Sequence, residues 1–249
     1  MKMDTQSLNG KVALVTGAGS GLGEATARAF GAAGCAVVCV DLNRQAVERV
    51  CAELRQSDVT ALPIAFDVSD ARAVTDVIEE VTGKLGRLDI IVNCAAIDHT
   101  VSVNEMSVEQ WDQVLAVNLR APFLFAKAAW PLMTRQGGGQ IFNVASTAAT
   151  RAWANAAAYH ASKWGLVGFS RGLGVEGRPA NIRVTTVIPG GMRTHFFDRF
   201  VEQNIPMPDE RNLQDPANVA RTIVFAATMP ADSALQEVII TPVTETSWP

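Results

Sequence analysis

Seven stretches of the chain are apolar almost without interruption and are rich in Val and Ile. A strand covered on both faces has no solvent-exposed side, so such continuous runs are typical of buried strands in a parallel sheet. The runs predict strands over residues 11–16, 35–40, 59–66, 88–93, 140–145, 182–189 and 237–242.

The segments between these strands have the apolar spacing of amphipathic helices. They predict helices over residues 23–34, 43–56, 70–85, 107–133, 156–176 and 215–228. This alternation predicts an α/β fold: a single domain over residues 1–249, with a Rossmann-like, doubly wound, seven-stranded parallel sheet and helices on both faces. Residues 191–214 contain two prolines and no strand run. We expect them to form a short lid beyond the sixth strand.

Composition narrows the class of protein. The chain is 48% hydrophobic and 18% charged, which supplies a sizeable core, and its net charge of −4 provides no positive field for nucleic acid or an anionic membrane. Its apolar runs are too short to span a membrane, and its first residues lack the apolar segment of a secretory leader. The four cysteines form no CxxC pair, and Cys35 and Cys39 would lie about 13 Å apart on one strand. We therefore expect reduced thiols and a cytoplasmic location.

The first strand leads directly into "TGAGSGLG", residues 16–23, and a helical pattern follows. Three glycines alone are a weak signal, but a strand, a glycine turn and a helix in this order are typical of dinucleotide-binding sites. Gly17 would allow the tight turn, Gly21 the approach of a pyrophosphate, and Gly23 the close packing of helix on strand. A tight turn without a ligand is the alternative.

Acidic residues end the next two strands. Asp41 lies 18 residues beyond Gly23, where an acid binds the adenosine ribose hydroxyls and repels a 2′-phosphate. The turn contains no Arg or Lys and Leu42 follows the acid, so we expect NAD rather than NADP. Asp41 could instead cap the following helix, although Asn43 is available for that. Asp67 is placed to accept from the adenine amino group, or else belongs to a loop that leads into a helix cap.

The only tyrosine of the chain, Tyr159, precedes Lys163 by one helical turn, so both project from one helix face. A phenol titrates at about pH 10, and a nearby ammonium group favours the phenolate. Such a tyrosine can take the proton of an alcohol as hydride leaves its carbon, or return it to a ketone. Ser146, which ends the fifth strand, would donate to the carbonyl oxygen and orient it. A tyrosine that only packs on an amphipathic helix is the alternative.

Together these motifs resemble the short-chain dehydrogenase/reductase family of about 250 residues, and the resemblance covers nearly the whole chain. Its motifs here are the TGxxxGxG turn at 16–23, Asp41, Asp67-Val68, the Asn-x-Ala element at 93–95, Asn118, Ser146, the YxxxK pair at 159 and 163, and the PGxxxT element at 189–194.

The resemblance implies specific roles. Asn118, Ser146, Tyr159 and Lys163 would be catalytic, with Asn118 supporting a water relay and Lys163 lowering the pKa of Tyr159 and holding the nicotinamide ribose. The segment after Pro189 would hold the carboxamide. The implied cofactor-binding residues are Gly17, Ser20, Gly21, Leu22, Gly23, Asp41, Leu42, Asp67, Val68, Asn93, Ala95, Tyr159, Lys163, Pro189, Gly190, Met192 and Thr194.

Several positions depart from the family's pattern. Cys94 stands where a second asparagine is frequent, and Ala96 where glycine is frequent. Trp164 follows the catalytic lysine, where small residues are common. The frequent terminal "DGG" is absent, and the ending "ITPVTETSWP" is closer to family members that act on hydroxy acids and related polar alcohols.

Residues around the expected substrate are mixed in character. The pocket should draw on residues 98–100, residues 147–153 and the lid. Its apolar members, if they do not simply pack on the domain, would be Phe196, Phe197, Phe200, Ile205 and Met207. Its cationic members, if not solvated, would meet an anion or a polyol, and they are His99, Arg151, Arg193 and His195. The three histidines of the chain have no metal-ligand spacing, so no metal is expected.

The sequence therefore predicts an oxidoreductase for small molecules, with no nucleic-acid or membrane partner. It would be an NAD(H)-dependent alcohol dehydrogenase for a secondary alcohol and its ketone. The alternatives are an NADPH-preferring ketoreductase of hydroxy-acid or 3-oxoacyl substrates, and a non-catalytic NAD-sensing protein. The apolar helix at 107–133 and its neighbour could bury their outer faces in a homotetramer or homodimer, or be covered within the subunit.

Overall fold

The computed structural model describes residues 7–202 and 205–245. Seven parallel strands form one sheet in the order β3-β2-β1-β4-β5-β6-β7, which confirms the predicted fold class. The strands are β1 (Val12–Thr16), β2 (Ala36–Asp41), β3 (Ala61–Ala65), β4 (Ile90–Asn93), β5 (Gly139–Val144), β6 (Ile182–Pro189) and β7 (Glu237–Ile240).

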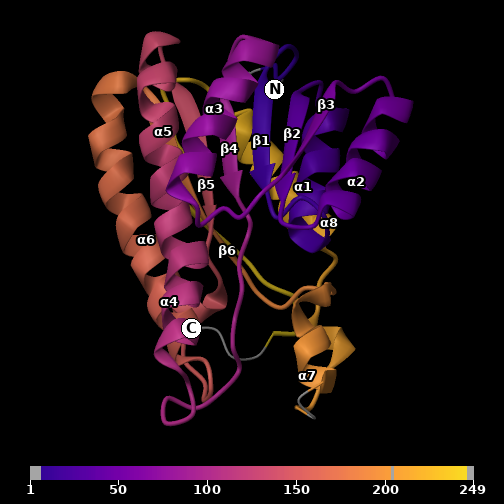
Figure 1. Ribbon diagram of the computed structural model, residues 1–249, viewed down its shortest axis with the longest axis vertical. Helices are drawn as coiled ribbons and strands as arrows, with labels where there is room; N and C mark the ends of the chain where they lie inside the picture. The colour runs from indigo at the N-terminus through magenta and orange to yellow at the C-terminus, as the bar shows by residue number, and fades with distance from the viewer. Residues whose placement is uncertain (1–6, 203–204, 246–249) are drawn as a thin grey trace.

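Helices cover both faces of the sheet (Figure 1). One face carries α1 (Gly21–Ala32), α2 (Arg44–Gln56) and α8 (Pro216–Ala227). The other carries α3 (Ala71–Leu85), α4 (Val108–Leu115), α5 (Ala121–Arg135) and α6 (Ala157–Gly177). Each face of the sheet packs on its helices through its own apolar core. Along β1, Ala13 and Val15 belong to the core on the α1 side, and Val12 and Leu14 to the core on the α3 side. Since successive strand residues point to opposite faces, this sharing explains why the strands are apolar throughout.

One predicted helix is interrupted. The sequence indicated an unbroken helix over residues 107–133, but a π-helical turn, Ala116–Arg120, separates α4 from α5. The buried side chain of Asn118 lies in this turn and bonds outside the helix, to the backbone of Ile97. A wider turn re-aims one residue without ending the helix, and such turns are frequent at functional sites.

The strands all end at one edge of the sheet, and the segment predicted as a lid lies beyond that edge (Figure 1). It contains the short helix α7 (Asp198–Glu202), flanked by 3₁₀ turns at His195–Phe197 and Glu210–Asn212. A bridge between Met192 and Gln214 closes its base. No helix in the described part of the chain is long and apolar enough to cross a membrane.

Candidate active site

A cavity of about 840 Å³ opens at the carboxyl ends of the strands. It gathers nearly all the residues that the sequence predicted for cofactor and catalysis. Those that line it are Gly17, Ser20, Gly21, Leu22, Gly23, Asp41, Leu42, Asp67, Val68, Ala95, Ser146, Tyr159, Lys163, Pro189, Gly190, Met192 and Thr194. Asn93 and Asn118 are not among its lining residues.

The glycine turn has the backbone of a phosphate site. Gly17 has φ of 67°, a left-handed conformation that favours glycine. A Cβ at Gly23 would collide with the carbonyl of Gly17, so only glycine lets α1 start this close to the turn. The Ser20 side chain makes no capping hydrogen bond. The first N–H groups of α1 can therefore serve an anion in the cavity.

Asp41 holds the turn from the end of β2. Its Oδ2 accepts from the backbone N–H of Gly19 at 2.9 Å, and its Oδ1 accepts from the N–H of Asn43 at 2.9 Å. The helix cap is Asn43, whose side chain accepts from the N–H of Ala46 at 3.1 Å. Asp41 is therefore not the cap and faces the cavity.

Sequence reasoning missed Arg49, which reaches the turn from α2. Its Nη2 donates to the carbonyl of Gly19 at 3.1 Å and to Glu24 at 2.6 Å. Glu24 also accepts from Arg28 at 2.7 Å. Burial opposes the ionisation of Glu24, but the hydrogen bonds from Arg49 and Arg28 outweigh it and hold its pKa below the usual value. The cation nearest the turn is thus already paired with a carboxylate.

Asp67 lies just beyond the end of β3, in the wall of the cavity. Its Oδ1 accepts from the backbone and hydroxyl of Ser69, both at 2.8 Å. The cap of α3 is Asp70, which accepts from the N–H groups of Arg72 and Ala73. Asp67 therefore lies in a loop that leads into the cap of α3, as one of the two alternatives predicted. The same carboxylate still lines the cavity.

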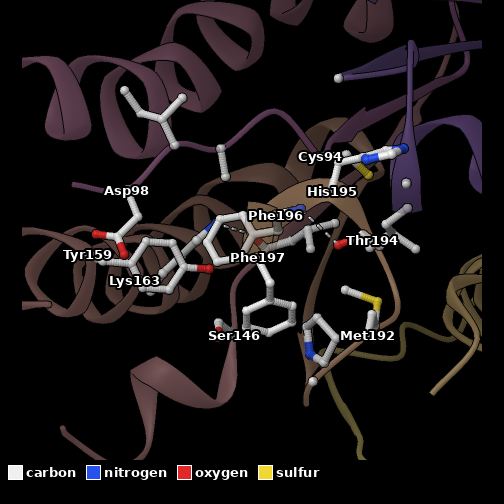
Figure 2. A pocket seen from close by; sticks show the side chains of 18 of the residues that line it. Cys94, Asp98, Ser146, Tyr159, Lys163, Met192, Thr194, His195, Phe196 and Phe197 are labelled. Atoms are coloured by element: carbon white, nitrogen blue, oxygen red, sulfur yellow. Dashed lines mark hydrogen bonds between the residues drawn. The ribbon is translucent and has the colours of Figure 1, made fainter. Parts of the chain in front are cut away.

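Tyr159 and Lys163 project from the first turns of α6, and both are buried. The Nζ of Lys163 donates to the carbonyl of Val144 at 2.8 Å and lies 5.5 Å from the centre of the Tyr159 ring. Burial lowers the pKa of Lys163 to about 8. Figure 2 shows the Tyr159 hydroxyl directed into the pocket on the side of Ser146, with Met192 and Thr194 across from them.

Ser146 begins a 3₁₀ turn directly after β5. Its Oγ accepts from the N–H of Ala148 at 3.1 Å, a contact that leaves the hydroxyl hydrogen free to donate. Cys94, which follows β4, stands where the sequence pattern led us to expect an asparagine. Burial raises the pKa of Cys94 to about 12, so it is a neutral thiol in the cavity wall.

The two asparagines that do not line the cavity hold its frame. Asn93 donates to Asn143 at 2.8 Å and so links β4 to β5. Asn118 accepts from the N–H of Ile97 and donates to its carbonyl, both at 2.8 Å, and it also donates to Ser162 at 3.1 Å. Asn118 therefore fixes the loop after β4 against α6.

Several predicted substrate-side residues are already engaged elsewhere. Arg193 donates to the carbonyl of Leu213 and lines a second cavity beside α1. His99 pairs with Gln113 on the surface. His195 pairs with Asp198 at 2.9 Å and also lines the main cavity. Arg151 lines the main cavity as well, and there it forms an ion pair with Glu245.

The segment predicted as a lid contributes an aromatic wall to the cavity. The ring of Phe196 lies 5.5 Å from that of Tyr159, and further contacts run from Phe196 to Phe197 and from Phe197 to Phe200. These three rings line the cavity, as does Trp153 from the loop after Ser146. Across residues 7–202 and 205–245, no group of three His, Cys, Asp or Glu side chains gathers in a way that could hold a metal ion.

The chain belongs to the short-chain dehydrogenase family, whose model matches residues 11–205. D-threitol dehydrogenase of Mycolicibacterium smegmatis is 42% identical over 182 residues, 73% of this chain and 70% of that protein. A metagenomic short-chain oxidoreductase in complex with NADP is 31% identical, with a TM-score of 0.84 over 96% of this chain and 100% of that one. The 3-ketoacyl-(acyl-carrier-protein) reductase of Brucella melitensis, complexed with NADH, is 34% identical, with a TM-score of 0.84 over 94% and 97%.

Proposed function

We propose that this protein is an NAD(H)-dependent dehydrogenase that interconverts a secondary alcohol and its ketone. One observation carries the proposal: a buried tyrosine with a lysine one helical turn away opens into the same cavity as an uncapped helix start and an acidic strand end. The family membership and the relatives named as dehydrogenases support the reaction class.

The residues present fit a nicotinamide dinucleotide. The N–H groups at the start of α1 suit the pyrophosphate, and Asp41 suits the adenosine ribose. Asp67 and Val68 would flank the adenine, while Ala95, Gly190, Met192 and Thr194 would surround the nicotinamide end. When bound, this cofactor supplies a ring carbon that takes up or releases hydride.

Each side chain near Tyr159 has its own role in transferring the substrate proton. Tyr159 takes the proton of the substrate hydroxyl during oxidation and returns it during reduction. The charge of Lys163 favours the phenolate, since an opposite charge nearby stabilises the ionised form. Ser146 donates to the substrate oxygen and holds it beside the phenol. Asn118 holds the loop at Ile97 against Ser162 of α6, and so supports a water path that leads the proton out of the cavity.

The electrostatics of the adenosine end support NAD over NADP. A 2′-phosphate would meet the carboxylate of Asp41, while Arg49, the cation nearest the turn, is paired with Glu24. Leu42, which follows the acid, is exposed and supplies no charge. We therefore place Asp41 as the residue that selects the cofactor.

A second candidate is an NADPH-dependent ketoreductase of hydroxy-acid or 3-oxoacyl substrates. The structural similarity to the 3-ketoacyl reductase and to the NADP-bound oxidoreductase favours it. A non-catalytic NAD-sensing protein is a weaker alternative, since Ser146, Tyr159 and Lys163 are all in the cavity.

The surface supports a homo-oligomer, which we propose as a cytoplasmic tetramer or dimer. Phe123 on α5 and Trp164 on α6 are about half exposed, at 45% and 54%. Phe123 also contacts Phe169 of α6, so the two helices share one apolar outer face. A second copy of the chain would cover this face.

The test is turnover of a panel of secondary alcohols with NAD and, separately, with NADP. The panel includes polyols, hydroxy acids, sterols and aryl alcohols. We expect oxidation of at least one class, with a higher kcat/KM for NAD than for NADP. A higher kcat/KM for NADP would favour the ketoreductase, and NADH binding without turnover of any substrate would favour the sensor.

A further inference from the structure

We propose that Glu245 determines the substrate class: its carboxylate selects a neutral diol or polyol and excludes hydroxy acids. The inference rests on the proposed dehydrogenase function and extends it to the charge of the substrate. It begins from an ion pair that lies inside the cavity, between the loop after Ser146 and the end of the chain.

Glu245 is held in place by the segment that follows β7. Its backbone N–H donates to the carbonyl of Pro242 at 3.0 Å, which closes a turn. The hydroxyl of Thr244 donates to the carbonyl of Arg211, so the lid anchors the same turn. A Cβ at Gly190 would collide with the Oε2 of Glu245. The carboxylate therefore lies directly against Gly190, in the space that a side chain at that position would occupy.

The two oxygens of this carboxylate differ in their contacts. Oε1 forms the ion pair with Nη2 of Arg151, and the Glu245 side chain is only 7% exposed. Within residues 7–202 and 205–245, the buried Oε2 accepts no hydrogen bond. A buried carboxylate oxygen without a donor is costly, so this atom calls for a donor from a ligand in the cavity. A substrate hydroxyl supplies such a donor.

Arg151, the cation of this ion pair, also contacts residues of its own loop. Arg151 also donates to the hydroxyl of Thr147 at 3.5 Å and lies 6.0 Å from the centre of the Trp153 ring. Its charge is therefore balanced by Glu245 and held by the loop after Ser146.

The charges of this wall disfavour an anionic substrate. Asp98 also lines the cavity and adds a second carboxylate to its wall. The carboxylate of a hydroxy acid could pair with Arg151 only by displacing Glu245, and it would share the cavity with two negative charges. Hydroxyl groups without charge can instead donate to Glu245 and Asp98, and their carbon chain can pack on Phe196.

Three probes of similar size test the inference: butane-2,3-diol, butan-2-ol and 3-hydroxybutyrate, each oxidised with NAD. For the wild type we expect the highest kcat/KM with the diol and the lowest with the hydroxy acid. Glu245→Gln removes the charge and keeps the shape. We expect its kcat/KM for the diol to fall about tenfold, and its kcat/KM for 3-hydroxybutyrate to rise, because the group that pairs with Arg151 and repels an anion is then neutral.

Two further variants separate specificity from folding. In the double variant Arg151→Gln/Glu245→Gln the cation is also gone, so the gain with 3-hydroxybutyrate should disappear. Glu237→Gln is the matched control, because it breaks the ion pair of Glu237 with Arg171, and neither residue lines the cavity. It should leave all three kcat/KM values unchanged.

Some outcomes would overturn the inference alone. These are a wild-type preference for 3-hydroxybutyrate or butan-2-ol, an equal loss with all three probes in Glu245→Gln, or weaker NADH binding by that variant in a fluorescence titration. The last result would assign the carboxylate to the nicotinamide carboxamide. The proposed function fails separately, if wild-type protein that binds NADH turns over no alcohol with either cofactor.

Discussion

The ammonium nitrogen of Lys163 lies 5.5 Å from the centre of the Tyr159 ring, and both side chains are almost fully buried. The hydrogen bond from Lys163 to the carbonyl of Val144 ties the amine to the end of β5. The distance between the two reactive groups is therefore set by the packing of α6 on the sheet, and it does not depend on a flexible loop.

The proton role of Tyr159 predicts a large effect from the loss of one oxygen. Tyr159→Phe keeps the ring and its contact with Phe196 but cannot exchange a proton. We expect kcat/KM to fall by about a thousandfold or more, in line with general acid–base catalysis. The Kd for NADH, measured by fluorescence titration, should change by less than about threefold, because the phenol oxygen is not needed to bind the cofactor. Retained turnover would refute the assignment.

The burial of Lys163 predicts a pH-dependent stability. Its folded pKa of about 8 lies below the value of 10.5 for an exposed lysine, so the unfolded chain binds more protons between these limits. The charged form of this lysine therefore destabilises the fold at and below neutral pH, and this destabilisation decreases as the pH rises towards 10. Relative to Lys163→Met, the free energy of unfolding of the wild type should rise by about 2 kcal/mol between pH 7.5 and pH 10.

Chemical denaturation of both proteins at the two pH values measures this difference. The matched control is Lys127→Met, which removes an exposed lysine from α5. Its difference from the wild type should be the same at both pH values. A pH-independent difference for Lys163→Met would show that burial does not shift the pKa of Lys163 from its value in the unfolded chain.

Asp41 should control the choice between NAD and NADP. In Asp41→Ala the ratio of kcat/KM for NAD to that for NADP should fall at least about tenfold, because the repulsion of the 2′-phosphate is lost. Arg49 also contacts Gly19, so it becomes the nearest cation to that phosphate. Adding Arg49→Gln should therefore reverse the gain with NADP. An unchanged ratio in Asp41→Ala would show that another residue selects the cofactor.

Asn118 should matter for stability as well as for turnover. Asn118→Leu keeps the approximate volume but leaves the N–H and carbonyl of Ile97 without their side-chain partner. We expect the free energy of unfolding to fall by about 3 kcal/mol, since buried polar groups lose their hydrogen bonds. Gln113→Leu, an exposed amide on α4, should change it by less than about 0.5 kcal/mol. Equal effects of the two variants would argue against a structural role for Asn118.

The fold could be predicted because its determinants are local. Continuous apolar runs mark the strands, and the helices between them require a parallel sheet. The predicted ends of the strands were less accurate. The third strand was predicted over 59–66, but in the structure it spans Ala61–Ala65. The seventh was predicted over 237–242, but it ends at Ile240. Apolar residues next to a strand can pack on the core without joining the hydrogen-bonded ladder.

Part of the site depends on contacts that no local pattern encodes. Gly17, Asp41 and Tyr159 were predictable because each stands at a fixed place relative to a strand or helix. Arg49 reaches the glycine turn from the next helix, and Glu245 reaches the cavity from the far end of the chain. Asn93 stands at a strand end, as predicted, but its side chain bonds to the neighbouring strand.

The π-helical turn at Ala116–Arg120 restricts how this chain can vary in length. It places one residue more in a turn than a regular helix does, which rotates everything after it by about 100°. Deleting a single residue here would restore a regular helix, yet Phe125 could then no longer face the sheet while Asn118 still faced Ile97. Natural variants and engineered libraries should accordingly tolerate exchanges of residue type in this segment far better than insertions or deletions.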